Sequence, residues 1–154
     1  MNLKHNSKNI GKIFAAVLTV VMILGAFAPS VLADNGKVHV IVENTTFTSA
    51  VDGKEPAFTG TAVDTEVDFT EGATMLSCLK AALEAANLSC EVVESTGYVS
   101  SINGLAEKDG GSAAGWMATL NDWFVNESIK DVSVAAGDEV RFMYTCKNMG
   151  ADLG

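Results

Sequence analysis

The sequence offers few side chains with the types and spacing of a catalytic site. It contains two histidines, and the one that lies beyond the N-terminal segment, His39, sits between Val38 and Val40 in a run that alternates like a strand. A Ser-His-Asp arrangement needs its histidine beside a nucleophile, and nothing in the spacing around His39 suggests one. We therefore expect His39 to be a solvent-facing strand residue, and we expect that the protein is not an enzyme.

The spacing of metal-ligating residue types does not predict a metal site either. The three cysteines are separated by 11 and 55 residues, which does not match the ligand spacing of zinc sites. Asp64, Glu66 and Asp68 alternate, so one face of a strand carries three carboxylates that would suit a cation. Because the calcium-loop pattern is missing, we expect a solvated strand face there and no metal site.

The sequence leaves the pairing of its cysteines, Cys78, Cys90 and Cys146, open. An oxidising compartment permits one disulfide with one thiol left over, in any of three pairings. The pair Cys78–Cys90 closes a short loop, and such a bond contributes at most ~3 kcal/mol by loop entropy. In the alternative, all three cysteines are small buried apolar groups, as unpaired cysteines often are.

Ligand contact is the chemistry that remains, and it would come from aromatic side chains and a glycine-rich loop. The candidate residues are Tyr98, Gly110, Gly111, Trp116, Trp123 and Phe124. Trp123 follows a predicted turn, where an indole is exposed at low entropic cost. The paired glycines let backbone approach a ligand closely, and Tyr98 would supply a hydroxyl. In the alternative, the aromatic residues form the core and edge of a sheet, and alternation turns Trp116 inward.

Two strands and one helix are predicted in the first half of the domain. The first strand covers Lys37–Glu43, and the second lies within Thr61–Phe69. The helix lies between Thr74, an N-cap residue, and Asn87, a stop signal. Its apolar positions recur at spacings of three and four residues and comprise Met75, Leu76, Leu79, Ala82, Leu83 and Ala86. A helix with one apolar face should lie across a sheet.

Further strands are predicted after the helix. They cover Cys90–Val93, Tyr98–Ile102, Trp116–Leu120, Trp123–Val125 and Glu139–Cys146. Val132 and Val134 also alternate, ahead of a Gly137-Asp138 turn. Several strands with one helix packed on one face predict an α+β domain.

The first 33 residues have the pattern of a secretory signal peptide. Three lysines precede an apolar run over Ile13–Ala28, Pro29 ends that run, and cleavage is expected after Ala33. A retained membrane anchor is the alternative, but the run is short for a span of ~20 residues. We therefore expect a secreted or cell-surface protein, with residues 34–154 as its domain and no membrane span after processing.

The predicted mature domain is strongly acidic. Cleavage would remove three of the ten basic residues and none of the 19 acidic ones, which leaves a net charge of −12 on 121 residues. This charge repels phosphate backbones and anionic membranes, so nucleic acids and such membranes are not expected as partners. A chain of this length fits one domain with one core.

Three further motifs are Gly97–Leu105, with the sequence GYVSSINGL, Gly115–Asn121, with the sequence GWMATLN, and Ala136–Val140, with the sequence AGDEV. Together they resemble the transcobalamin-like C-terminal domain family, which is common in bacterial cell-surface proteins. The helix start over Gly72–Leu83 also fits, and the resemblance covers Lys37–Gly154. It implies a β-grasp-like fold, which is a mixed sheet with one helix packed across it.

The resemblance also implies a ligand. In vertebrate cobalamin carriers this domain covers one face of the corrinoid and a helical α/α barrel holds the other, but this sequence contains no such barrel. The strand of Trp116 matches a ligand-facing strand of the carriers, although the neighbouring residues differ. We therefore expect a binding module for a corrinoid, or cobalamin-like, ligand with no covalently bound cofactor. The alternative is a structural or adhesive interaction domain of the cell surface, with a protein partner and no small ligand.

Processing provides the first test. Mass spectrometry of the exported protein should give an N-terminus at Asp34, because the charged, apolar and small-residue zones of the leader align at that site. Recovery of exported protein that retains the residues before Pro29 would contradict the signal-peptide interpretation.

Overall fold

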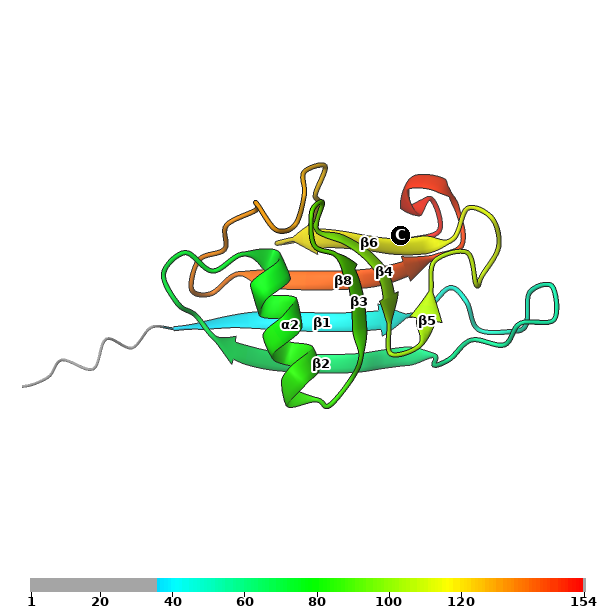
Figure 1. The fold of residues 1–154 in the computed structure, drawn as a ribbon, viewed down its shortest axis with the longest axis horizontal. Helices are drawn as coiled ribbons and strands as arrows, with labels where there is room; N and C mark the ends of the chain where they lie inside the picture. Colours follow the sequence, from blue (N-terminus) through cyan, green and yellow to red (C-terminus); the bar gives the residue numbers. More distant parts are fainter. Residues whose placement is uncertain (1–35, 154) are drawn as a thin grey trace, which may run out of the picture. The chain divides into compact units, whose positions relative to one another are not determined.

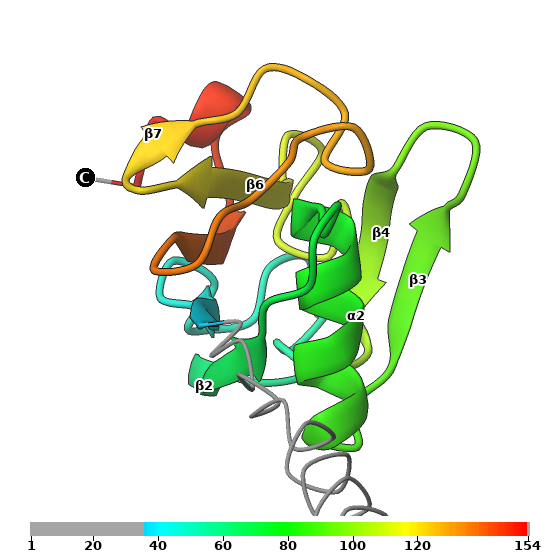
Figure 2. The same ribbon diagram turned by 90° about the vertical axis from the view of Figure 1, so that its left-hand side faces the viewer.

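A mixed five-stranded sheet forms the centre of the structure, a computed structural model that describes residues 36–153. Its strands are β1 (Lys37–Asn44), β2 (Gly60–Asp68), β6 (Gly115–Leu120), β7 (Trp123–Phe124) and β8 (Glu139–Thr145). They lie in the order β2-β1-β8-β6-β7, with β1 and β8 parallel and the other neighbours antiparallel (Figure 1; β7 is labelled in Figure 2). Parallel neighbours need a long connection, and here that connection contains a helix and a second sheet.

The helix α2 (Met75–Ala85) begins and ends where its sequence signals predict. The Thr74 hydroxyl accepts a hydrogen bond from the Ser77 amide at 3.3 Å, and the Thr74 amide donates to the Ser77 hydroxyl at 2.8 Å, which forms a capping box. Asn87 follows the helix in the left-handed region, with a φ of 56°. No helix within residues 36–153 has the length and apolar character of a membrane span.

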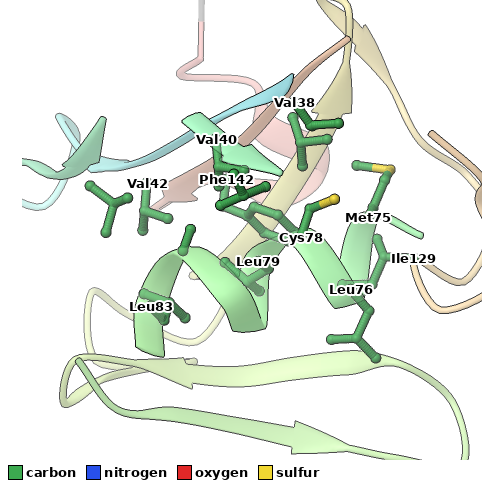
Figure 3. Packing of buried hydrophobic residues seen from close by; sticks show 14 of the residues in the cluster. Val38, Val40, Val42, Met75, Leu76, Cys78, Leu79, Leu83, Ile129 and Phe142 are labelled. Atoms are coloured by element: carbon green, nitrogen blue, oxygen red, sulfur yellow. The ribbon is translucent and has the colours of Figure 1, made fainter. Parts of the chain in front are cut away.

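The apolar face of α2 packs on the sheet and forms the main core (Figure 3). The strand residues Val40 and Phe142 and the helix residues Leu79 and Leu83 are each at most 2% exposed, which confirms the strand alternation and the helical spacing. The other buried residues of α2 are Met75, Leu76, Cys78 and Ala82. Trp116 differs from the prediction of an inward-facing, largely buried residue, because it lies half-buried between this core and a second cluster. This smaller cluster consists of Phe47, Leu105, Ala114 and Tyr144.

The segment 129–134 binds the start of the helix instead of forming the extended strand that its valine alternation suggests. The Val132 carbonyl accepts a hydrogen bond from the Met75 amide at 3.0 Å, and the Ile129 carbonyl accepts one from the Leu76 amide at 3.1 Å. These amides belong to the first turn, where a helix has no carbonyl of its own to offer them. Ile129 is also buried in the main core. The segment is therefore held to α2 by both backbone and side-chain contacts.

A smaller antiparallel sheet lies beside α2 (Figure 2). Its strands are β3 (Cys90–Val93), β4 (Tyr98–Ile102) and β5 (Leu105–Ala106), in the order β3-β4-β5. The predicted Asn103-Gly104 turn joins β4 to β5, with φ values of 49° and 78° that suit a two-residue hairpin. Two sheets with one α-helix in the described residues confirm the predicted α+β class.

Charged side chains cover the face of the main sheet that points away from α2. The ring nitrogens of His39 lie 2.7 Å from Asp64 Oδ1 and 3.2 Å from Glu139 Oε2. The hydrogen bond to Asp64, followed by that to Glu139, raises the pKa of His39 above its ordinary value. The His39 side chain is 37% exposed, which confirms the predicted solvent-facing position. Asp64, Glu66 and Asp68 are exposed, and no group of three residues within 36–153 has the arrangement of a metal site.

The three cysteines carry free thiols in the structure, so the Cys78–Cys90 bond is not formed. Cys78 is 3% exposed in the main core, whereas Cys90 is half-buried at the start of β3. Burial raises the pKa of both thiols. These surroundings match the alternative in which the cysteines act as small apolar groups.

The packing of α2 can be tested by shortening one core side chain. Leu83→Ala should lower the free energy of unfolding by ~2–5 kcal/mol, because the leucine is 2% exposed and leaves a cavity. Glu84→Ala, one residue away on the exposed face, should change it by less than ~0.5 kcal/mol. Urea unfolding of both variants measures the difference, and equal small losses would contradict the assigned helix face.

Candidate functional site

A groove with a volume of about 380 Å³ lies where β4 of the small sheet passes β6 of the main sheet. Its walls come from residues of Thr96–Val99, of Trp116–Ala118 and of the connection Val125–Ile129, with Phe142 on the core side. We call this the β4–β6 groove. It brings together two of the predicted contact residues, Tyr98 and Trp116, which come from different sheets. A preformed, mostly apolar groove of this kind is the usual position of a ligand site.

Trp116 is a fixed wall of the groove. Its indole Nε1 donates a hydrogen bond to the Leu105 carbonyl at 3.0 Å, so its only polar atom is already satisfied within the protein. The ring meets Tyr144 edge to face at a centroid distance of 5.3 Å and stacks near Phe58 at 6.2 Å. These contacts hold the indole in one orientation, so Trp116 offers a ligand apolar ring surface and no hydrogen-bond donor.

Tyr98 forms the exposed rim of the groove, with 44% of its surface accessible. Its hydroxyl donates a hydrogen bond to the Glu107 carboxylate. This hydrogen bond, together with partial burial, raises the pKa of Tyr98 to about 12. The sequence suggests that Tyr98 would supply a hydroxyl to a ligand, but the structure commits the proton of that hydroxyl to Glu107. Tyr98 can therefore offer a ligand its ring face and, as a hydrogen-bond acceptor, its hydroxyl oxygen.

Gly97 and Ser128 close one end of the groove, and neither is among the predicted contact residues. The Ser128 hydroxyl donates to the Thr96 carbonyl, which ties the 125–129 connection to the start of β4. Gly97 has a φ of 69°, and a Cβ at this position would lie 2.7 Å from Ser128 Oγ. Any larger residue would push the connection away. Local patterns do not reveal such a contact, because its two residues are far apart in the sequence.

Trp123 and Phe124 lie outside the β4–β6 groove. Trp123 pairs with Leu120 and Phe124 with Thr119, so the two rings point to opposite faces of the sheet. Trp123 is 81% exposed and Phe124 is 41% exposed. The hairpin therefore presents Trp123 to solvent as predicted, but it does not place it against Trp116 in the groove.

The paired glycines also lie elsewhere. The Gly110 amide donates to the Tyr144 hydroxyl at 3.0 Å, and a Cβ on Gly110 would lie 2.8 Å from Cys146 Sγ. Gly110 thus allows close packing within the smaller cluster and is buried there. Gly111 has a φ of 117° with open space around it, so it serves the turn. Neither glycine lines the groove.

A second groove of about 380 Å³ lies on the charged face of the sheet, beside Phe124 and Asp152. Arg141 is the only positively charged side chain among the residues that line this groove, and it pairs with Glu43 at 3.1 Å and with Glu139 at 2.9 Å. The guanidinium charge is therefore neutralised by the protein's own carboxylates. This leaves the second groove without an unpaired charge to attract an anion.

Sequence comparison finds a family model that matches part of the chain. Residues 72–146 match the model of a domain of unknown function, DUF4430. This stretch begins just before α2, ends just after β8 and contains every residue that lines the β4–β6 groove. Comparison with proteins of curated function gives no match.

Comparison with solved structures finds similar chains at low sequence identity. Haptocorrin in complex with Cbi is similar at a TM-score of 0.55 and 15% identity, over 74% of this chain and 25% of the haptocorrin chain. The chain thus spans about a quarter of that protein. A candidate metal-binding protein from Ruminococcus gnavus ATCC 29149 has a TM-score of 0.42 and 19% identity, over 71% of this chain and 96% of its own.

The hydrogen bond at the groove rim can be tested by titration. The chain has two tyrosines, and neither should ionise near pH 10, because the pKa of Tyr98 is about 12 and burial raises that of Tyr144. Glu107→Gln removes the carboxylate charge and should lower the pKa of Tyr98 toward 10. Glu94→Gln, in the same hairpin, should leave it unchanged. Ultraviolet absorbance measures both, and a phenol that ionises near pH 10 in the unmodified protein would contradict the contact.

Proposed function

We propose that this chain is a secreted, transcobalamin-like binding module whose β4–β6 groove contacts one part of a corrinoid ligand. The observation that carries the proposal is the preformed apolar wall of the groove. Trp116 is held by its bond to Leu105 and by its ring contacts, so a flat apolar ligand would bind without first ordering it. The proposal includes a β-grasp-like fold, supported by the mixed sheet with α2 across one face and by the likeness to part of haptocorrin.

The size of the groove limits how much of a ligand it can hold. Its volume of about 380 Å³ is near the lower end of the ~300–1,000 Å³ that ligand sites occupy. A corrinoid is a large macrocycle, so the groove would take one edge or substituent of it and leave the rest uncovered. A site that covers only part of its ligand should bind weakly, with an affinity no better than roughly micromolar, or ~8 kcal/mol.

A second component therefore belongs to the proposal. The haptocorrin structure is a complex with Cbi, and this chain corresponds to about a quarter of that protein. We infer that a separate helical protein or domain covers the remaining face of the ligand. Its contribution would convert a weak site into a tight one by enclosing more of the ligand surface.

Export and a purely binding role complete the proposal. The leader over residues 1–33 lies outside the described residues, and its sequence pattern supports a secreted or surface location. His39 supports a non-catalytic role, because both of its ring nitrogens lie against carboxylates and it sits on the face of the sheet opposite the main core.

A structural or adhesive interaction domain is the second candidate function. Trp123 is 81% exposed on one face of the hairpin, Phe124 is 41% exposed on the other, and Met149 is 79% exposed. Phe124 approaches Gly150 of the short helix η1 (Asn148–Gly150), where an added Cβ would lie 3.4 Å from the ring. Large apolar side chains that are this exposed are typical of protein contact surfaces.

A corrinoid titration tests the first candidate. Cobalamin should quench the fluorescence of Trp116 with a dissociation constant of roughly micromolar or weaker. Tyr98→Ala should weaken binding about tenfold, or ~1.4 kcal/mol, because it removes the rim of the groove. Trp123→Ala is the matched control: it should leave the affinity unchanged and make Trp116 the only tryptophan reporter.

Two results would oppose the proposal. No signal at millimolar cobalamin would remove the corrinoid from consideration. A loss of binding in Trp123→Ala with none in Tyr98→Ala would move the ligand site from the groove to the exposed hairpin. Only the first result would favour the interaction domain.

A further inference from the structure

One edge of β6 carries backbone groups that have no partner. In its antiparallel ladder with β8, the hydrogen-bonding residues alternate with residues whose backbone groups point the other way. The amide of Asn121 donates to the Glu139 carbonyl at 2.9 Å, so Asn121 is one of the residues that hydrogen-bond to β8. Every second residue before it, Thr119 and Met117, does the same. The backbone groups of Trp116, Ala118 and Leu120 therefore point away from β8.

β7 covers only the last part of that edge. Leu120 pairs with Trp123, and the Ala118 carbonyl accepts a hydrogen bond from the Val125 amide at 3.1 Å. Within residues 36–153, nothing hydrogen-bonds to the amide or carbonyl of Trp116, or to the amide of Ala118. Two donors and one acceptor thus stand in a row along the β4–β6 groove.

The open edge is a consequence of how the next segment is anchored. If the hairpin continued past Val125, Glu127 would pair with Trp116. Instead the Ser128 hydroxyl binds the Thr96 carbonyl, and Ile129 is buried in the core with its carbonyl on the Leu76 amide. These contacts draw the chain across to β4 and away from β6. The fold itself therefore leaves this edge unpaired.

The groove beside this edge is acidic at its rim. The Glu127 carboxylate lines it, is exposed, and forms no ion pair within the described part of the chain. Glu107 lies at the same rim through its bond to Tyr98. The residues Gly115–Ala118 include no lysine or proline, which are the side chains that usually keep an exposed edge from pairing.

We propose that an extended peptide with a basic residue adds to the free edge of β6, through the amide and carbonyl of Trp116 and the amide of Ala118. Main-chain bonds of this kind bind a strand, and alternate side chains then supply specificity. One apolar side chain of the peptide would enter the β4–β6 groove against Trp116, and a lysine or arginine would pair with Glu127. The proposal does not depend on corrinoid binding, although both would use the same groove.

Amide hydrogen exchange on the full chain tests the edge directly. In the free protein, the amides of Trp116 and Ala118 should exchange much faster than those of Met117 and Thr119, which bond to β8. The probe is an equimolar mixture of acetyl-Lys-Val-Xaa-Val-Lys-amide peptides in which Xaa is Ala, Val, Leu or Phe. At ten times the dissociation constant, exchange at Trp116 and Ala118 should slow about tenfold. Equal protection of all four amides without peptide would overturn the open edge.

Substitutions separate the backbone contacts from the charge. Ala118→Pro removes the outward-facing donor without removing a bond to β8, and it should weaken peptide binding about tenfold. Glu127→Gln should weaken it about two- to fivefold, with less dependence on salt. Glu71→Gln, an exposed residue in the turn before α2, is the matched control and should change nothing. If Ala118→Pro does not fold, the exchange measurement on the unmodified chain decides whether the peptide binds along the edge of β6.

The remaining outcomes distinguish this inference from the proposed function. Absence of any exchange change at millimolar peptide, or equal binding of peptides with glutamate in place of lysine, would overturn the peptide inference alone. Absence of cobalamin binding with clear peptide protection would overturn the corrinoid proposal alone. If both ligands bind, cobalamin should displace the peptide, because the two share the wall formed by Trp116.

Discussion

The parallel pairing of β1 with β8 is the contact on which the rest of the structure depends. It aligns Val40 with Val140 and Val42 with Phe142, so the first and last strands present one continuous apolar surface. This surface is what the apolar face of α2 covers, and burial of such side chains supplies most of the stability of a small domain. The pairing also places β6, which lies on the far side of β8, next to the small sheet. Without it, the two walls of the β4–β6 groove would not meet.

The groove owes its shape to a segment that has no regular structure. The residues after β7 bind the start of the helix, since the carbonyls of Ile129 and Val132 accept hydrogen bonds from the first turn of α2. The same residues bind the start of β4 through Ser128, and Gly97 makes room for that contact. One segment therefore completes the helix start, closes the end of the groove and leaves the edge of β6 uncovered. A feature that looks like a surface loop thus determines what the surface can bind.

The elements were predictable from the sequence where the determining interactions are local. Thr74 caps the helix through a residue three positions away, and the valines of β1 alternate because one face is buried. The site was predictable only in part. Tyr98 and Trp116 meet in the groove, but Gly110 packs under Tyr144, and Trp123 points to solvent. Contacts between distant segments decide these cases, and no local pattern records them. The same holds for the cysteines, whose pairing depends on geometry that spacing does not fix.

The direction of the two central strands has a mechanical consequence. Because β1 and β8 run in parallel, the chain enters β1 at one end of the sheet and leaves β8 at the opposite end (Figure 1). A tensile force applied through these two points would pull the strands past each other along their length. The five paired positions from His39 to Glu43 would then be loaded together in shear, whereas a hairpin pulled from its open end breaks one bond at a time. The fold is thus arranged to resist extension along the axis of its sheet.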